Sequence, residues 1–167
     1  GLMDSLGRSV VSHCTFRGNT SLRGGGAYVR GPLGGADVVR FQNCVFEGNS
    51  AQRGGGLATE DATGAAALCT FAGNQASQGG ALYAFAGAGA EWRLSNSILW
   101  GNAAPTGAQI AYNGTLRVDA CDVEGGPAGA ALGTLGAGGA LVWGAGNLAL
   151  DQMFAGQPAN FPEIGKH

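Results

Sequence analysis

Apolar and polar residues alternate with a period of two in one short phrase that returns along the chain. The phrase first reads Cys14-Thr15-Phe16-Arg17-Gly18-Asn19; close copies occupy residues 44–49 and 69–74, and looser copies occupy residues 97–102 and 121–126. A period of two is typical of a β-strand, whose successive side chains point to opposite faces. Because the copies return every 24 to 30 residues, the pattern predicts a solenoid of stacked coils.

Three sets of equivalent positions carry apolar residues that are expected to face the inside of such a coil. One set lies in the phrase itself, one lies three residues before its first position, and one lies eight residues after its final Asn. The sets are Phe16, Phe46, Phe71, Leu99 and Val123; Val11, Phe41, Ala66, Leu94 and Val118; and Ala27, Leu57, Leu82 and Ile110. Three short strands per coil predict an all-β, right-handed parallel β-helix of about five to six coils, with successive coils ~4.8 Å apart.

The Asn that ends each phrase is expected to stack on its equivalents and to form a ladder of side-chain amides. Its four copies are Asn19, Asn49, Asn74 and Asn102, and each is followed five residues later by glycine. Glycine adopts the positive φ angles of tight corners without steric cost. Asn also tolerates the left-handed conformation and bonds to its own backbone, so the sequence predicts that the Asn helps to form the corner.

The four cysteines occupy the first position of the phrase, which predicts that they form one inward column. They are Cys14, Cys44, Cys69 and Cys121. Stacked cysteines come within disulfide range, but parallel Cβ directions disfavour the ~90° torsion of the bond. Buried, reduced thiols that act as small apolar side chains are the favoured interpretation, with disulfides as the alternative. With two histidines and no Cys-x-x-Cys pair, the sequence predicts no metal site, and no cofactor is expected.

Composition narrows the class of protein further. Of the 167 residues, 33 are glycine and 12% are charged, while 45% are hydrophobic, which argues against disorder. A formal net charge of −2 gives no electrostatic reason to expect nucleic acid as a partner. No apolar run approaches the ~18 residues that span a bilayer, and no signal peptide is recognised. We expect a piece of a longer chain, with coils over residues 1–155 and an extended tail over residues 156–167.

Two motifs give the repeat a family resemblance. Phe16-Arg17-Gly18-Asn19 is followed by Gly25-Gly26-Ala27-Tyr28, and Phe71-Ala72-Gly73-Asn74 is followed by Gly79-Gly80-Ala81-Leu82. This combination of Phe-x-x-Asn with Gly-Gly-Ala resembles the repeat of the chlamydial polymorphic outer-membrane proteins. The later stretch Asn96-Ser97-Ile98-Leu99-Trp100-Gly101-Asn102 is similar to the closing coils of large secreted bacterial right-handed β-helix proteins.

The resemblance implies a bacterial protein that is secreted or exposed at the outer membrane, with an export signal outside this chain. It implies an adhesive role, or a structural role in an envelope or stalk. The partners it implies are a glycan, a surface protein of a host or neighbouring cell, or other subunits of a surface assembly. A polysaccharide lyase or glycoside hydrolase that acts on the outer face is the alternative function, and a subunit of a larger surface assembly is another.

Candidate catalytic residues lie on outward positions of the strands. A lyase or hydrolase needs two or three converging carboxylates, in some cases with an Arg base. Asp122 and Glu124 form the one acidic pair within a strand, and they are candidates. Arg17 and Glu47 fall on neighbouring coils and are also candidates, although an exposed ion pair is the simpler interpretation. The Glu60-Asp61 pair falls in a connector and is expected to be a solvated turn. The sequence favours a non-enzymatic chain.

Outward aromatic residues are the second kind of candidate. Tyr28 and Tyr83 share a column nine residues after the Asn, and Trp100 is expected to face outward beside Ala72. Exposed aromatic faces suit sugar rings or protein partners, so these three residues are the predicted ligand contacts. Packing beneath a neighbouring loop is an equal alternative.

Overall fold

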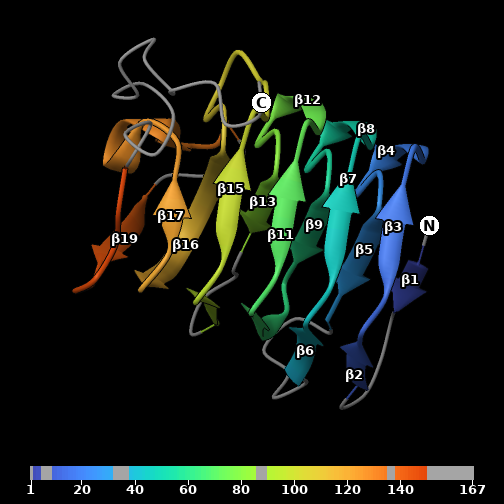
Figure 1. Ribbon diagram of the computed structural model, residues 1–167, viewed down its shortest axis with the longest axis horizontal. Coiled ribbons are helices and arrows are strands. Elements are labelled where there is room, and N and C mark those ends of the chain that lie inside the picture. The colour runs from blue at the N-terminus through green and yellow to red at the C-terminus, as the bar shows by residue number, and fades with distance from the viewer. Residues whose placement is uncertain (1, 5–8, 32–37, 86–89, 135–137, 150–167) are drawn as a thin grey trace, which may run out of the picture.

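The computed structural model describes residues 2–4, 9–31, 38–85, 90–134 and 138–149, which fold into parallel strands stacked along one axis (Figure 1). Every pair of neighbouring strands in the described ranges is parallel. This topology confirms the predicted parallel β-helix of about five to six coils. The predicted tail over residues 156–167 lies outside the described residues.

The strands of the described residues form three sheets. The largest is bent into two arms that share the long strand β16 (Ile110–Asp119). The β5 arm contains β1 (Leu2–Asp4), β5 (Ala27–Arg30), β9 (Leu57–Glu60), β13 (Leu82–Phe85), the first half of β16 and β18 (Ala130–Leu132). The β6 arm contains β2 (Ser9–Ser12), β6 (Val38–Gln42), β10 (Thr63–Ala67), β14 (Glu91–Ser95), the second half of β16 and β19 (Gly139–Trp143).

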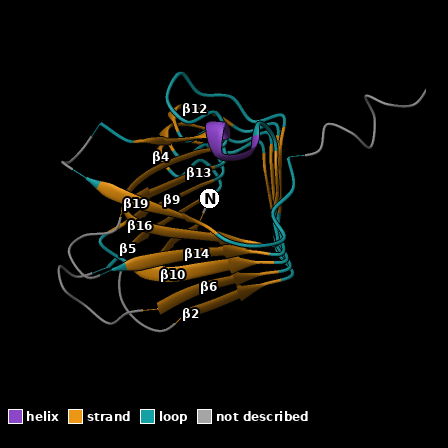
Figure 2. Cartoon of the chain, turned by 90° about the vertical axis from the view of Figure 1, so that its left-hand side faces the viewer, coloured by secondary structure: helices purple, strands orange, loops and turns teal. Residues whose placement is uncertain are grey.

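Two smaller sheets close the tube. One contains β3 (Thr15–Arg17), β7 (Val45–Glu47), β11 (Thr70–Ala72), β15 (Ile98–Trp100) and β17 (Asp122–Val123). The other contains β4 (Thr20–Arg23), β8 (Ser50–Arg53) and β12 (Gln75–Gln78), and a short 3-10 helix, η1 (Gly126–Gly129), follows β17. Viewed along the stack, the sheets surround one interior (Figure 2). The first three coils therefore carry four strands each, because the stretch after each Asn also pairs, where the sequence indicated three.

The strand register places the three predicted apolar sets in three vertical columns. Phe16 pairs with Phe46 and Phe46 with Phe71, and their rings stack with centroids 4.9 and 4.6 Å apart. Phe41 packs edge-on against Phe46 at 5.6 Å and links two columns. Side chains from all three columns form one buried cluster in the centre of the tube. Stacked aromatic pairs add about 0.5–1.5 kcal/mol beyond their area burial, so the Phe column contributes directly to coil cohesion.

Glycine, and not Asn, takes the left-handed conformation at the corner before each Asn. Gly18, Gly48, Gly73 and Gly101 have φ between 61° and 63°. The Asn at each of these corners is thereby free to point inward, which corrects the prediction that the Asn takes the left-handed conformation itself. A second corner, just before the Cys column, uses residues other than glycine at positive φ: His13, Asn43, Leu68, Asn96 and Ala120. Leu and Ala are rare in this conformation, and the sequence pattern gave no sign of it.

The inward-pointing Asn side chains form a continuous hydrogen-bonded ladder. The Nδ2 of Asn49 donates to Oδ1 of Asn74 at 2.9 Å, and the Nδ2 of Asn74 donates to Oδ1 of Asn102 at 2.9 Å. Each Oδ1 also accepts from the backbone N–H of the preceding Asn in the ladder, at 2.9–3.0 Å. Asn49 and Asn74 are fully buried. Because every rung joins two successive coils, the ladder fixes the register of the stack.

The Cys column consists of free thiols, each donating to the carbonyl oxygen two residues before it, at 3.2–3.3 Å. Cys44, Cys69 and Cys121 are buried, whereas Cys14 is exposed. Burial raises the pKa of the Cys69 thiol and of the Cys121 thiol to about 11. A thiol with so high a pKa contains almost no thiolate near neutral pH, and thiolate is the reactive form.

Thiol labelling is expected to separate Cys14 from the other cysteines. Iodoacetamide at neutral pH should modify Cys14 in the folded protein, because that side chain is exposed. Cys44, Cys69 and Cys121 should react only after denaturant is added, because they are buried and react as thiolate. Peptide mass spectrometry measures the modification at each site. Labelling of Cys69 as fast as Cys14 in the folded protein, or a disulfide between any two, would contradict the column.

The described residues contain no helix long and apolar enough to cross a membrane.

Candidate functional site on the outer face

The four residues predicted as an alternative catalytic group do not converge. Arg17 and Glu47 form an exposed ion pair on the outside of β3 and β7, with Arg17 Nε and Nη2 each 2.9 Å from a Glu47 oxygen. Asp122 and Glu124 lie at the other end of the same sheet, on and just after β17. Arg17 is four coils from Glu124, a separation of roughly 19 Å at ~4.8 Å per coil.

Glu124 is engaged in the local structure. Its Oε2 accepts from the backbone N–H of Gly101 at 2.8 Å and from Nε2 of Gln109 at 2.7 Å. Gln109 is buried and in turn accepts from the Nδ2 of Asn102 at 2.7 Å. Through Gln109, Glu124 therefore extends the hydrogen-bonded chain of the Asn ladder by one more carboxylate.

Tyr83 is buried, which corrects its prediction as an exposed ligand contact. It points outward from β13, but its exposed fraction is 0%. Its neighbours in the same column, Ala58 and Ala111, are small, so the ring has room to lie against the sheet. The guanidinium of Arg53 lies over the ring, 5.8 Å from its centroid, and the backbone at Gly133 packs against its edge. An outward direction was predictable from the period of two, but the covering groups come from other coils.

Tyr28 and Trp100 are both partly exposed. Tyr28 lies on β5 and donates its hydroxyl to Oε2 of Glu60 at 2.7 Å. Trp100 ends β15 and pairs in register with Ala72, as expected. The structure does not bring the three aromatic residues together, because Trp100 lies in a different sheet from Tyr28 and Tyr83.

Glu60 is the centre of a polar cluster that the sequence analysis missed. It is 8% exposed, which corrects its interpretation as part of a solvated turn. Nη1 of Arg23 donates to its Oε2 at 2.8 Å, and Nη1 of Arg53 lies 3.9 Å from its Oε1. Tyr28 supplies the third partner. The available signal was positional: Arg23 and Arg53 both stand four residues after an Asn of the ladder, immediately before the glycine corner.

The phenols of this cluster are held in their protonated form. Burial raises the pKa of Tyr28, and its hydrogen bond to Glu60 raises it further. Burial also raises the pKa of Tyr83. Tyr28 therefore acts as a hydrogen-bond donor to Glu60, and the cluster clamps the first two coils together on the outside of the β5 arm. With Glu60 covered and surrounded by these partners, the arrangement is suited to stability more than to ligand binding.

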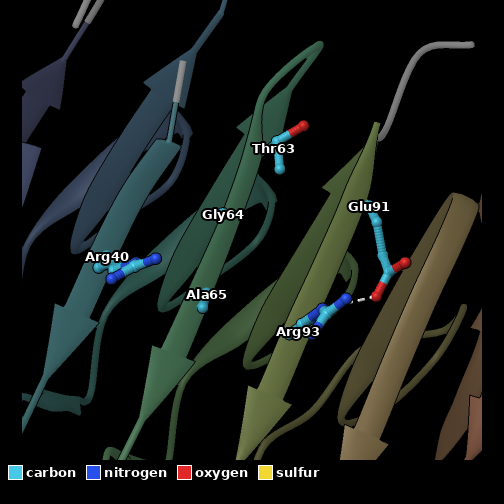
Figure 3. Close-up of a pocket in the computed structure, with 6 residues that line it drawn as sticks. All are labelled: Arg40, Thr63, Gly64, Ala65, Glu91 and Arg93. Carbon is cyan, nitrogen blue, oxygen red and sulfur yellow. Dashed lines mark hydrogen bonds and ion pairs between the residues drawn. The ribbon is translucent and has the colours of Figure 1, made fainter. Parts of the chain in front are cut away.

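A groove of about 250 Å³ lies on the outer face of the β6 arm, over strands β6, β10 and β14 (Figure 3). Arg40 on β6 and Arg93 on β14 flank it, and Gly64 and Ala65 on β10 lie between them. Thr63 and Glu91 complete the lining. The groove exists because Ala65 occupies a column that is filled on both sides by arginine.

The groove was also predictable from position alone, although the sequence analysis did not identify it. Its column lies four residues before the Cys position and contains Val10, Arg40, Ala65, Arg93 and Arg117, followed by Val142. Within the described ranges, no group of three or more His, Cys, Asp and Glu side chains is placed to hold a metal ion.

Comparison with known families connects the coils to a repeat. Residues 68–84 match the family described as Chlamydia polymorphic membrane protein (Chlamydia_PMP) repeat. The match spans β11, β12 and most of β13, and the matched residues include the Phe-x-x-Asn phrase and the Gly-Gly-Ala motif of the third coil. No curated protein and no solved structure matches the chain. The chain is a parallel β-helix whose coils resemble the chlamydial polymorphic membrane protein repeat.

Proposed function

We propose that this chain is a non-enzymatic, cell-surface segment of a bacterial β-helix protein, with an adhesive or structural role. The match of residues 68–84 to a repeat described for membrane proteins is the observation that carries the proposal. The matched repeat belongs to a regular stack, in which equivalent residues of neighbouring coils pair in register. A rigid stack with long outer faces is suited to display binding surfaces away from a membrane.

Two further observations support a non-enzymatic role. Arg17 and Glu47 neutralise each other, and Glu124 holds Gly101 and Gln109. These side chains therefore have structural partners, and Glu124 lies several coils from the Arg17–Glu47 pair. A lyase or hydrolase that used all four predicted residues would need them to converge on one substrate, whereas the Arg17–Glu47 pair and the Asp122–Glu124 pair lie three to four coils apart.

Surface display is tested on intact cells of the organism that encodes the chain. An antibody raised against the folded segment should label intact cells, and a protease added outside should remove the signal while a cytosolic marker survives. A signal that protease reaches only after lysis would contradict the proposal.

Catalysis is tested in parallel with purified protein. Incubation with a panel of polysaccharides should release no new reducing ends. Release that disappears in Asp122→Ala and Glu124→Ala variants would contradict the non-enzymatic role and establish the lyase or hydrolase alternative.

A further inference from the structure

The arginine groove on the β6 arm carries positive charge that its own lining does not neutralise. Arg93 Nε is 2.7 Å from Oε1 of Glu91, and Arg117 Nε lies 3.7 Å from the same oxygen. Arg40 has no ion-pair partner among the described residues. Guanidinium groups stay charged at all physiological pH values. The Glu91 carboxylate thus pairs with two guanidinium groups on one side of the groove, and the Arg40 guanidinium lies on the opposite side.

The groove holds the guanidinium groups of Arg40 and Arg93 on its two opposite sides. Arg40 and Arg93 pair with the two sides of Ala65, so their Cα atoms are two coils apart, roughly 10 Å. Ala65 is the floor, and its methyl group leaves the space that a longer side chain would fill. Gly64 beside it faces inward, where a Cβ would collide with the buried ring of Trp92 at 2.6 Å. The packing of Trp92 in the core therefore requires glycine at position 64. On the opposite face of β10, the small side chain of Ala65 leaves the groove open.

We propose that this groove binds an anionic sugar residue of an acidic polysaccharide. Guanidinium groups bind carboxylate and other oxyanions through two parallel N–H···O bonds, which Arg40 and the Nη atoms of Arg93 can supply. Glu91 Oε2 and the hydroxyl of Thr63 provide acceptors for sugar hydroxyl groups. A site with both cationic donors and neutral or anionic acceptors matches a ligand that carries an acidic group and hydroxyl groups together.

The size and charge of the site favour this ligand class over two others. At about 250 Å³ the groove is smaller than the ~300–1,000 Å³ of sites that enclose a drug-sized molecule, so it accommodates one residue of a longer polymer. Arg117 continues the column on the next coil and is placed for a second anionic group along the polymer. Nucleic acid binding relies on many phosphate contacts, which three arginines in a chain of net charge −2 do not supply. The proposal deepens the adhesive role proposed above by naming its ligand class.

The test is a binding titration with three polymers: heparin, which is sulfated, polygalacturonate, which is carboxylated, and dextran, which is neutral. Binding of heparin or polygalacturonate, weakened between 50 and 200 mM salt, is expected, and dextran should not bind. Preference for heparin assigns a sulfate group, and preference for polygalacturonate assigns a carboxylate. Failure of both acidic polymers to bind, or equal binding of dextran, overturns the proposal.

Three variants locate the binding. Arg40→Ala removes a cation and should weaken binding about tenfold or more, the loss of one charge-assisted contact. Ala65→Leu fills the groove without changing charge and should weaken binding by a similar factor, because the ligand can no longer enter. Arg30→Ala is the matched control, because Arg30 is an exposed arginine on the β5 arm and its loss changes net charge equally. Circular dichroism and thermal melting confirm that each variant is folded. Unchanged binding in both groove variants, or an equal loss in Arg30→Ala, overturns the proposal. Surface labelling of cells does not depend on this result, so the two proposals fail separately.

Discussion

Gly55→Ala is expected to lower the free energy of unfolding by about 3 kcal/mol or more, because the corner after β8 has no space for a methyl group. A Cβ at this position would collide with the carbonyl oxygen of Gly80, and would lie 2.6 Å from O and 2.8 Å from N of Gln75. All three atoms belong to the backbone of the next coil, so no side-chain rotation relieves the contact. The coils would have to separate at this corner.

Gly48→Ala is the matched control for this prediction. Gly48 has φ of +61°, but a Cβ there would meet no atom of the described residues within 4 Å. The expected cost is that of placing alanine in the left-handed conformation, about 1–2 kcal/mol. Urea denaturation of the two variants measures the difference as a shift in midpoint at constant slope. If Gly55→Ala is no more destabilising than Gly48→Ala, the close contact between coils at this corner is wrong.

Asn74→Ala is expected to be about as damaging as Gly55→Ala, at about 3–5 kcal/mol. Asn74 is fully buried, and its Nδ2 donates to the carbonyl oxygen of Phe46 at 2.9 Å. Its Oδ1 accepts from both nitrogens of Asn49, at 3.0 Å from the backbone and 2.9 Å from the side chain. Alanine would leave the Phe46 carbonyl and the Asn49 N–H buried and without these partners, and each such group costs about 1–3 kcal/mol.

Asn19→Ala tests whether position in the ladder decides the cost. Asn19 is half-buried at the first rung, and Oδ1 of Asn49 accepts from both its backbone N–H and its Nδ2. After substitution the backbone N–H still reaches Asn49, so the expected cost is only about 1 kcal/mol. Equal urea midpoints for Asn19→Ala and Asn74→Ala would show that the ladder does not act as a buried network.

The residues that face the core could be predicted from the sequence, because they follow two simple periods. Alternation along the strand identifies which residues face the core, and the 24- to 30-residue repeat aligns them in columns. Phe16, Phe46 and Phe71 illustrate this, since their spacing alone predicts the stack that the ring distances show. A column of identical residues fixes the register between coils, because any other register would place unlike side chains together.

The exposure of the outward side chains was harder to predict, because alternation along a strand does not indicate which other side chains cover that face. Tyr83 was predicted either as an exposed ligand contact or as packed beneath a loop, and the group that covers it is Arg53 from the preceding coil. Glu60 was assigned to a solvated turn, yet long side chains from Arg23 and Tyr28 reach across to it. In both cases the decisive contact joins different coils through flexible side chains, whose direction the periodicity does not encode.

The arginine groove shows the same limit in another form. Arg40, Ala65 and Arg93 occupy equivalent positions of three successive coils, so their alignment could be read from spacing. Ala65 is the informative residue, because its short side chain leaves the groove between two long arginine side chains. A search for chemically active residue types passes over such a position.

The most direct test of the stacked coils is nuclear Overhauser spectroscopy on isotope-labelled protein. The structure predicts contacts between the side-chain amide protons of Asn49 and Asn74, and between the rings of Phe46 and Phe71, across 25 residues of sequence. It also predicts that the β5 and β6 arms lack the close Hα–Hα contacts of antiparallel pairs. Strong Hα–Hα contacts between consecutive strands, with the Asn and Phe contacts missing, would show a meander of hairpins and contradict the parallel β-helix.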